Sequence, residues 1–154
     1  MALGKYIDTK IGRLYLAEDD GCIVHLTNGW APEGDIQGSS LLLKQAEKEV
    51  TEYLAGKRQE FTVPVKAKGT PFQEKVWAAL RRIPFGETRS YGQIAETVGS
   101  PKGARAVGMA CNKNPVLLFI PCHRVVGSTG KLVGFACGLS MKEKLLKLEG
   151  RKRP

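Results

Sequence analysis

The sequence has no long apolar run and no clustered cysteines. None of its apolar stretches approaches the ~20 residues that cross a bilayer, and its N-terminus lacks a basic segment followed by an apolar signal core. The four cysteines form no Cys-x-x-Cys pair and no dense disulfide pattern: Cys22, Cys111, Cys122 and Cys137. These absences disfavour a membrane protein or a disulfide-stapled secreted protein. They predict a soluble, intracellular protein with reduced thiols and no membrane partner.

Charge is distributed unevenly along the 154 residues, whose net charge is +9. Residues 1–65 carry seven Lys/Arg and ten Asp/Glu, a net −3, whereas residues 66–154 carry 17 and five, a net +12. This polarity indicates that the C-terminal part binds a polyanion, and phosphate contacts are the natural use of the excess. A solubilising surface would give the same composition. With 42% hydrophobic residues, the chain can bury the core of one large domain or two small ones.

The N-terminal part predicts an α/β domain. Short strands are expected over residues 6–9, 14–17 and 22–26. Asp20-Gly21 indicates a tight hairpin between the last two strands. Ser39 or Ser40 is expected to cap a helix that ends at Gly56. Residues 61–65 predict one more strand, at a sheet edge because of Pro64.

A linker over residues 66–69 separates the two predicted domains, 1–67 and 68–154. Cys22 and His25 could serve as metal ligands in the first domain, but two ligands do not make a site and no further ligand is apparent. The sequence favours core residues here over a zinc site and leaves a structural metal in this domain open.

The C-terminal part predicts helices and a β-hairpin. Three helix starts carry the Ser/Thr-x-x-Glu/Gln capping box: Thr70 with Gln73, Ser90 with Gln93, and Ser140 with Glu143. Pro71 and Pro101 are expected at first helical positions. The last helix is expected over residues 141–149, ending at Gly150.

Residues 91–111 have the length and punctuation of a helix-turn-helix. A helix over 91–98 ends at Gly99, and Ser100 is expected to cap a second helix that runs to about Cys111. This second helix is rich in small residues, which allow close approach to a narrow groove and leave Arg105 projecting from the helix. Tight packing between helices would also explain its glycines.

The run Ile120-Pro121-Cys122-His123-Arg124-Val125-Val126 is the most informative in the chain. A buried strand over 116–120 is expected to deliver the cysteine, and residues 125–133 are expected to form a wing-like hairpin. A thiolate is a strong nucleophile, and a neighbouring base makes it available at neutral pH. The alternative is a buried structural cysteine, because adjacent residues in an extended segment point to opposite faces.

Several motifs occur in a fixed order through residues 70–150: Thr70-x-Phe72-Gln73-x-x-Val76-Trp77, Ile83-Pro84-x-Gly86-x-Thr88-x-Ser90-Tyr91, Ala104-Arg105-Ala106-Val107-Gly108, Asn114-Pro115, Ile120-Pro121-Cys122-His123-Arg124-Val125 and Leu145-Leu146-x-x-Glu149. Together they resemble the O6-alkylguanine-DNA alkyltransferases, also called methylated-DNA–protein-cysteine methyltransferases. The resemblance implies an N-terminal α/β ribonuclease H-like domain and a mainly α C-terminal winged helix-turn-helix-like domain. The N-terminal part resembles the first of these in layout more than in motif.

The resemblance also implies a reaction. The family binds duplex DNA in the minor groove and flips the O6-alkylguanine out of the stack. Cys122 would attack the alkyl carbon, His123 would take the thiol proton through a water, and Glu149 would orient the imidazole. The thioether product is stable, so the protein is consumed by one irreversible turnover without a cofactor. Transfer from O4-alkylthymine and cooperative binding by the otherwise monomeric protein stay open.

Further roles are implied by the same resemblance. Arg105 would fill the gap left by the flipped base. Tyr91 would crowd the target phosphate and donate a hydrogen bond to the departing guanine, and Asn114 would tie the recognition helix to the cysteine segment. The remaining expected DNA contacts are Gln73, Gly92, Ser100 and Ser128. The expected walls of the guanine pocket are Val125, Phe135, Ala136 and Cys137.

Three other functions fit parts of the sequence. A non-catalytic relative would bind damaged DNA but lack the acceptor cysteine, which is present here. A transcriptional regulator would need several base-reading side chains on the second helix, and a cysteine hydrolase would need an oxyanion hole. The sequence favours the alkyltransferase. A prokaryotic, cytoplasmic protein is favoured, and a eukaryotic one would be nuclear.

Overall fold

A computed structural model describes residues 2–130 and 138–150. The chain divides into two compact units. The first consists of residues 1–67 and 115–119, and the second of the remaining residues from 68 onward.

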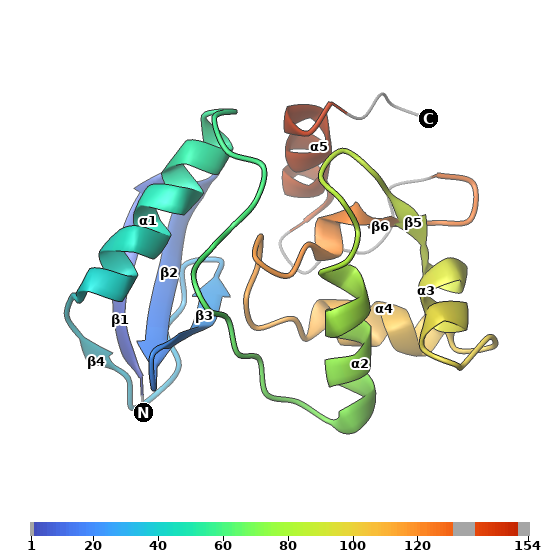
Figure 1. Ribbon diagram of the computed structural model, residues 1–154, viewed down its shortest axis with the longest axis horizontal. Helices are drawn as coiled ribbons and strands as arrows, with labels where there is room; N and C mark the ends of the chain where they lie inside the picture. Colours follow the sequence, from blue (N-terminus) through green and yellow to red (C-terminus); the bar gives the residue numbers. More distant parts are fainter. Residues whose placement is uncertain (1, 131–137, 151–154) are drawn as a thin grey trace. The chain divides into compact units, whose positions relative to one another are not determined.

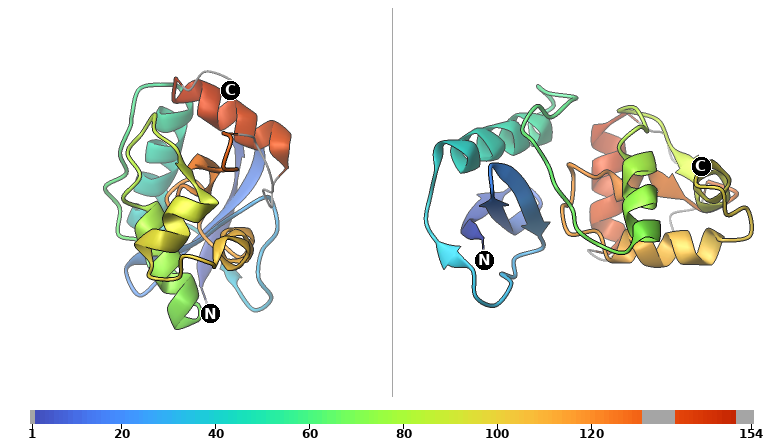
Figure 2. Two further views of the ribbon diagram at one scale, coloured as in Figure 1. Left: turned by 90° about the vertical axis from the view of Figure 1, so that its right-hand side faces the viewer. Right: turned by 60° about the horizontal axis from the view of Figure 1, so that its bottom comes forward.

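The first unit is a four-stranded sheet with one long helix. Its strands are β1 (Leu3–Thr9), β2 (Gly12–Asp19), β3 (Cys22–Thr27) and β4 (Ile36–Gln37), in the order β3-β2-β1-β4. The first three pair antiparallel, and β4 pairs parallel with β1. Helix α1 (Leu41–Leu54) covers one face of this sheet (Figures 1 and 2).

Local sequence signals account for most of this unit. Asp20 and Gly21, with φ of 51° and 75°, make the predicted tight turn between β2 and β3. Ser40 is the cap of α1, since its Oγ accepts a hydrogen bond from the Leu43 N–H at 3.1 Å. Gly56 follows the helix with a φ of 76°, a conformation that glycine adopts without strain.

The predicted strand over residues 61–65 is wrong except for its last residue. The backbone N–H and the hydroxyl of Thr62 donate to the buried carboxylate of Glu49, at 2.8 and 2.6 Å. Val65 alone pairs with the sheet, in a parallel bridge to Ile23. A carboxylate on α1 has therefore taken hydrogen-bonding groups that a strand would use.

The predicted strand over residues 116–120 is also wrong, although all five residues are buried. Val116 makes a single parallel bridge to Leu26 of the first unit. The chain then turns, because Leu118 has a φ of 69° and the Phe119 N–H donates to the Leu117 carbonyl at 2.8 Å. The apolar run therefore correctly predicts that these residues are buried, but it wrongly predicts an extended backbone.

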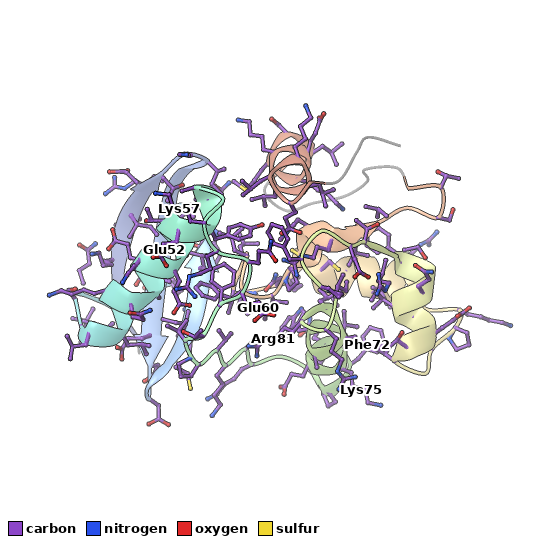
Figure 3. All side chains as sticks on the ribbon, turned by 45° about the horizontal axis from the view of Figure 1, so that its top comes forward. Glu52, Lys57, Glu60, Phe72, Lys75 and Arg81 are labelled. Carbon is purple, nitrogen blue, oxygen red and sulfur yellow. The ribbon has the colours of Figure 1, made fainter. Side chains whose placement is uncertain are left out.

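The second unit is built mainly of helices. They are α2 (Pro71–Leu80), α3 (Tyr91–Thr97), α4 (Ala104–Asn112), the 3₁₀ turn η1 (Cys122–Arg124) and α5 (Leu139–Leu148). Helices α2, α3 and α4 pack on one another, and α5 packs on η1 (Figure 1). The indole N–H of Trp77 donates to the Ala110 carbonyl at 2.9 Å and so joins α2 to α4. Lys75 on α2 and Arg81 directly after it are exposed (Figure 3).

Two of the three predicted capping boxes are confirmed. Thr70 with Gln73 starts α2, and Ser90 with Gln93 starts α3. The third is wrong, because α5 starts at Leu139 after Gly138, with no side-chain cap. Ser100 and Pro101 likewise do not start α4.

A turn precedes α4 instead. The Gly103 N–H donates to the Ser100 carbonyl at 2.7 Å, and Gly103 itself is the cap residue. The polar and proline residues before α4 therefore shape a turn, and the helix begins at Ala104.

The predicted wing is described only in part. Strand β6 (Val125–Val126) pairs parallel with β5 (Arg89–Ser90), not with a following strand in the described part of the chain. Leu132 and Val133, the predicted partners in the hairpin, lie outside the described residues.

The described residues contain neither a membrane-spanning helix nor a cluster of metal ligands. No helix there has the length and apolar character needed to cross a membrane. No group of three or more His, Cys, Asp or Glu side chains in residues 2–130 and 138–150 is arranged to hold a metal ion.

Candidate active site

Cys122 lies in a tight turn at the start of η1, inside the second unit. Its N–H donates to the Ile120 carbonyl at 2.8 Å, and the Arg124 N–H donates to the Pro121 carbonyl at 3.0 Å. Only 3% of the residue is exposed. Successive side chains of a 3₁₀ turn diverge by about a third of a revolution and do not alternate as in a strand. Because the backbone here is a 3₁₀ turn and not a strand, the side chains of Cys122 and His123 do not have to point to opposite faces.

Asn114 connects the end of α4 to the cysteine. Its side-chain Nδ2 donates to the Ile120 carbonyl at 2.8 Å and to the Cys122 Sγ at 3.2 Å. Asn114 comes two residues after α4, so a displacement of that helix end would change the hydrogen bond to sulfur. Asn114 therefore links the segment after α4 to Cys122 by hydrogen bonds, while its role in the reaction stays a prediction.

The thiol of Cys122 is protonated at neutral pH. Burial raises its pKa to about 11, while the Asn114 hydrogen bond and the positive charge of Lys142 act in the opposite direction. A base is therefore needed to generate a thiolate at this position.

The imidazole of His123 is held against a buried carboxylate. Its Nε2 donates to Glu149 Oε2 at 2.7 Å, and the exposed fractions of the two side chains are 1% and 0%. Burial lowers the pKa of His123 and outweighs Glu149, which acts to raise it. The ring is neutral at rest, which is the form that can accept a proton.

Glu149 also binds an arginine and a turn. Arg124 donates to both carboxylate oxygens, from Nε to Oε1 at 2.8 Å and from Nη2 to Oε2 at 3.0 Å. The Gly86 N–H donates to Oε1 at 3.2 Å, and Arg124 Nη1 donates to the Ile83 carbonyl at 2.6 Å. The carboxylate is thus fixed by donors from two parts of the second unit, η1 and the turn at Gly86.

Tyr91 lies at the start of α3 beside a buried lysine. Lys142 Nζ donates to the Tyr91 hydroxyl at 3.4 Å. Burial, and then the neighbouring Cys111 and Cys122, raise the pKa of Tyr91 to about 12. The phenol therefore keeps its proton and can donate it in a hydrogen bond.

Two family models match the chain. The first is the 6-O-methylguanine DNA methyltransferase, DNA binding domain, over residues 71–151. The second is the 6-O-methylguanine DNA methyltransferase, ribonuclease-like domain, over residues 3–67. The chain belongs to the 6-O-methylguanine DNA methyltransferase family.

Individual relatives match between 70% and 96% of the chain. A Mycobacterium leprae protein named methylated-DNA–protein-cysteine methyltransferase is 42% identical over 153 residues, which cover 93% of this chain and 89% of the relative. A Methanosarcina acetivorans protein of the same name is 52% identical over 107 residues, covering 70% and 69%. The crystal structure of Mycobacterium tuberculosis OGT in complex with DNA is 40% identical, with a TM-score of 0.90 over 96% of this chain and 93% of that one.

These matches support the two-domain prediction at the level of the family: a ribonuclease-like domain followed by a DNA-binding domain. DNA is accordingly the partner of this 6-O-methylguanine DNA methyltransferase family member. The structure brings together the predicted Cys122, His123, Glu149 and Asn114, and it places Tyr91 in contact with Lys142 in the same unit.

The predicted DNA contacts lie on exposed or half-exposed parts of the second unit. Arg105 is exposed on α4, and Ser128 is exposed in the turn after β6. Gln73 uses its side-chain oxygen in the capping box of α2, where it accepts from the Thr70 N–H at 3.0 Å. Ser100 belongs to the turn before α4, and Gly92 is the second residue of α3.

The predicted guanine pocket is described in part. Val125 is fully buried in β6, directly after η1. Phe135, Ala136 and Cys137 lie outside the described residues.

Sequence reasoning missed two charged residues of this site. Arg124 follows the Cys-His pair directly, and its buried pairing with Glu149 requires a contact between segments 25 residues apart. Lys142 is fully buried on α5. It precedes Glu149 by two helical turns, so both residues lie on the side of α5 that carries Leu145. Two charged residues on an apolar helix face were the sequence pattern that could have indicated this buried site.

Proposed function

We propose that this protein repairs alkylated DNA by direct reversal, moving the alkyl group from O6 of guanine to the Sγ of Cys122. The observation that carries the proposal is the hydrogen-bonded arrangement of Cys122 with Asn114, and of His123 with Glu149, in a member of this family. The protein acts as a methylated-DNA–protein-cysteine methyltransferase that is inactivated by its own reaction.

The chemistry is a single displacement. His123 accepts the thiol proton through a water, and since Glu149 engages Nε2, the nitrogen that receives this proton is Nδ1. The sulfur attacks the alkyl carbon, a C–S bond forms, and the bond between that carbon and O6 breaks. The electron pair leaves with guanine, which is restored. The thioether has no route back to a thiol, so each molecule acts once.

Tyr91 acts on the leaving group of this displacement, and Asn114 acts on the attacking sulfur. The protonated phenol of Tyr91 donates a hydrogen bond to guanine as negative charge develops on the departing base. Asn114 donates to the sulfur and supports its developing charge. No cofactor takes part in this scheme.

Helices α3 and α4 act as a helix-turn-helix in the minor groove, within a winged domain. Arg105 projects from α4 and fills the gap left by the flipped base. At Gly92 an added Cβ would meet only Ser90 Oγ, at 3.8 Å, so the fold itself does not require glycine there. Close approach of a phosphate explains its small size. Gln73, Ser100 and Ser128 add contacts to the DNA backbone, and Val125 forms part of the wall of the guanine pocket.

The same scheme fits a monomer with functional domains at 1–67 and 68–154. The relatives named above are bacterial and archaeal, in keeping with a cytoplasmic location. The first domain acts as scaffold, since its net charge of −2 does not attract DNA.

Intact mass spectrometry tests the proposal. The purified protein is incubated with a duplex that carries one O6-methylguanine, and peptides are mapped afterwards. We expect the mass of one methyl group on Cys122, in equal amount to restored guanine. Cys122→Ala should bind the lesion without gaining mass, and Cys22→Ala, in β3 of the first unit, is the matched control that should react normally. A protein that binds the lesion and stays unmodified would refute the transfer and indicate a damage sensor.

A further inference from the structure

The carboxylate of Glu149 is shared between the imidazole of His123 and the guanidinium of Arg124. Oε2 accepts from His123 Nε2 at 2.7 Å and from Arg124 Nη2 at 3.0 Å, while Oε1 accepts from Arg124 Nε at 2.8 Å. The exposed fractions of the Arg124 and Glu149 side chains are 8% and 0%. Of these three residues, the proposed reaction uses only His123 and Glu149, so Arg124 has no assigned part in it.

A guanidinium at this position opposes the effect of Glu149 on the imidazole. A lone buried carboxylate beside His123 would favour the imidazolium, which cannot accept the thiol proton. The planar guanidinium of Arg124 matches the two carboxylate oxygens of Glu149. Its third contact, from Nη1 to the Ile83 carbonyl at 2.6 Å, fixes the guanidinium from the other side.

We propose that Arg124 is a positioning residue of the alkyl transfer: its two-pronged bond to Glu149 holds that carboxylate against His123 and keeps the imidazole neutral between binding events. This inference rests on the proposed role of His123 as the base. Arg124 touches neither the thiol nor the DNA in this scheme and acts only through Glu149.

The charges around His123 come from η1 and α5. Arg124 adjoins it on η1, and α5 contributes Lys142, with Glu149 directly after its last residue. Arg124 and Lys142 both act to lower the pKa of His123, in the direction of burial. The charged groups of α2, which also packs on η1, are Glu74 and Lys75, and both are exposed. Two buried cations therefore face one buried anion.

The turn that precedes β5 completes the clamp. The Gly86 N–H donates to Glu149 Oε1, and a Cβ at Gly86 would come within 3.1 Å of the Glu149 carbonyl oxygen. Glu87 and Arg89, the charged residues after this turn, pair with each other at the surface at 3.0 Å. The turn thus supports Glu149 without adding a charge near His123.

The test is the pH dependence of single-turnover methyl transfer in Arg124→Gln and Arg124→Lys. In Arg124→Gln the unopposed Glu149 should make His123 more basic, so we expect the acid limb of the profile to move to higher pH. Arg124→Lys keeps the charge and loses the fork, so its limb should stay in place while its plateau rate falls. Arg58→Gln is the matched control, because it breaks a half-exposed pair with Glu52, at 2.9 Å, in the first unit. It should leave the profile unchanged.

An unmoved acid limb in folded Arg124→Gln, with a uniformly lower rate, would reduce Arg124 to a structural role and overturn the proposal. If Arg124→Gln fails to fold, Arg124→Lys decides: a lower plateau with unchanged DNA affinity supports the positioning role, and an unchanged plateau refutes it.

NMR separates this proposal from the proposed function. The chain has two histidines, so the ring signals of His123 and His25 can be followed in a Cys122→Ala background, where no transfer occurs. Arg124→Gln should move the titration of His123 to higher pH and leave that of His25, in the first unit, unchanged. A moved titration without a moved rate profile would keep the effect of Arg124 and refute His123 as the base.

Discussion

Replacing Glu149 with glutamine should destabilise the second unit severely. The carboxylate is fully buried and accepts hydrogen bonds from Arg124, His123 and Gly86. Removing one partner of a buried ion pair leaves an uncompensated charge and typically costs about 3–5 kcal/mol of unfolding free energy. Glu143→Gln is the control on the same helix, since its exposed pair with Lys147, at 3.5 Å, is worth about 0.3–0.5 kcal/mol.

The assay is urea denaturation followed by tryptophan fluorescence. Trp77 is 3% exposed in the second unit and Trp30 is 59% exposed in the first, so a Trp30→Phe background makes the signal specific for the unit that contains Glu149. A loss below about 1 kcal/mol, the range of surface pairs, would refute the buried pairing. The double variant with Arg124→Gln should lose less than the sum of the two single variants, because no unpaired guanidinium remains.

Further predictions concern titration, thiol access and helix capping. Because burial lowers the pKa of His123 from 6.5, the unfolded state binds its proton first as the pH falls below 6.5. The unfolding free energy should therefore decrease as the pH is lowered below 6.5, by at most about 1.4 kcal/mol per pH unit. His123→Gln should reduce this pH dependence, as measured by urea denaturation. Peptide mapping after iodoacetamide treatment at neutral pH should show slower labelling of buried Cys122 than of half-buried Cys22. Ser90→Ala should cost about 1 kcal/mol by thermal unfolding, whereas Ser140→Ala should cost almost nothing, since only the first is a helix cap.

The site was predictable from sequence where its residues form local motifs. Cys122 and His123 are adjacent, and a turn of backbone is enough to bring them together. Glu149 is distant from this pair in the sequence, and only the family resemblance, not a physical rule, predicted that it belongs to the site. Lys142 and Arg124 were missed because the burial of a cation can be predicted only when its partner is known, and each partner lies elsewhere in the chain.

The errors in the fold have the same physical origin. Residues 61–65 have the composition of a strand, but the carboxylate of Glu49 takes two donors of Thr62. Residues 116–120 have the composition of a buried strand, but Leu118 turns the chain. Hydrophobic pattern determines which residues are buried, whereas competition for hydrogen bonds between distant segments determines their backbone geometry.

The energetics of the thiol explain why so buried a nucleophile suits a protein that reacts once. With a pKa of about 11, Cys122 is a thiolate in about one molecule in ten thousand at pH 7. Moving its proton to an imidazole whose pKa lies below 6.5 costs at least about 6 kcal/mol in the free protein. Small electrophiles therefore meet a protonated, inaccessible sulfur. The cost is recovered only when an alkyl carbon is held against the sulfur, so that proton transfer and displacement proceed together. Burial thus protects the single-use thiol from stray reagents, and the neutral His123, fixed by Glu149 and Arg124, keeps it available for the lesion.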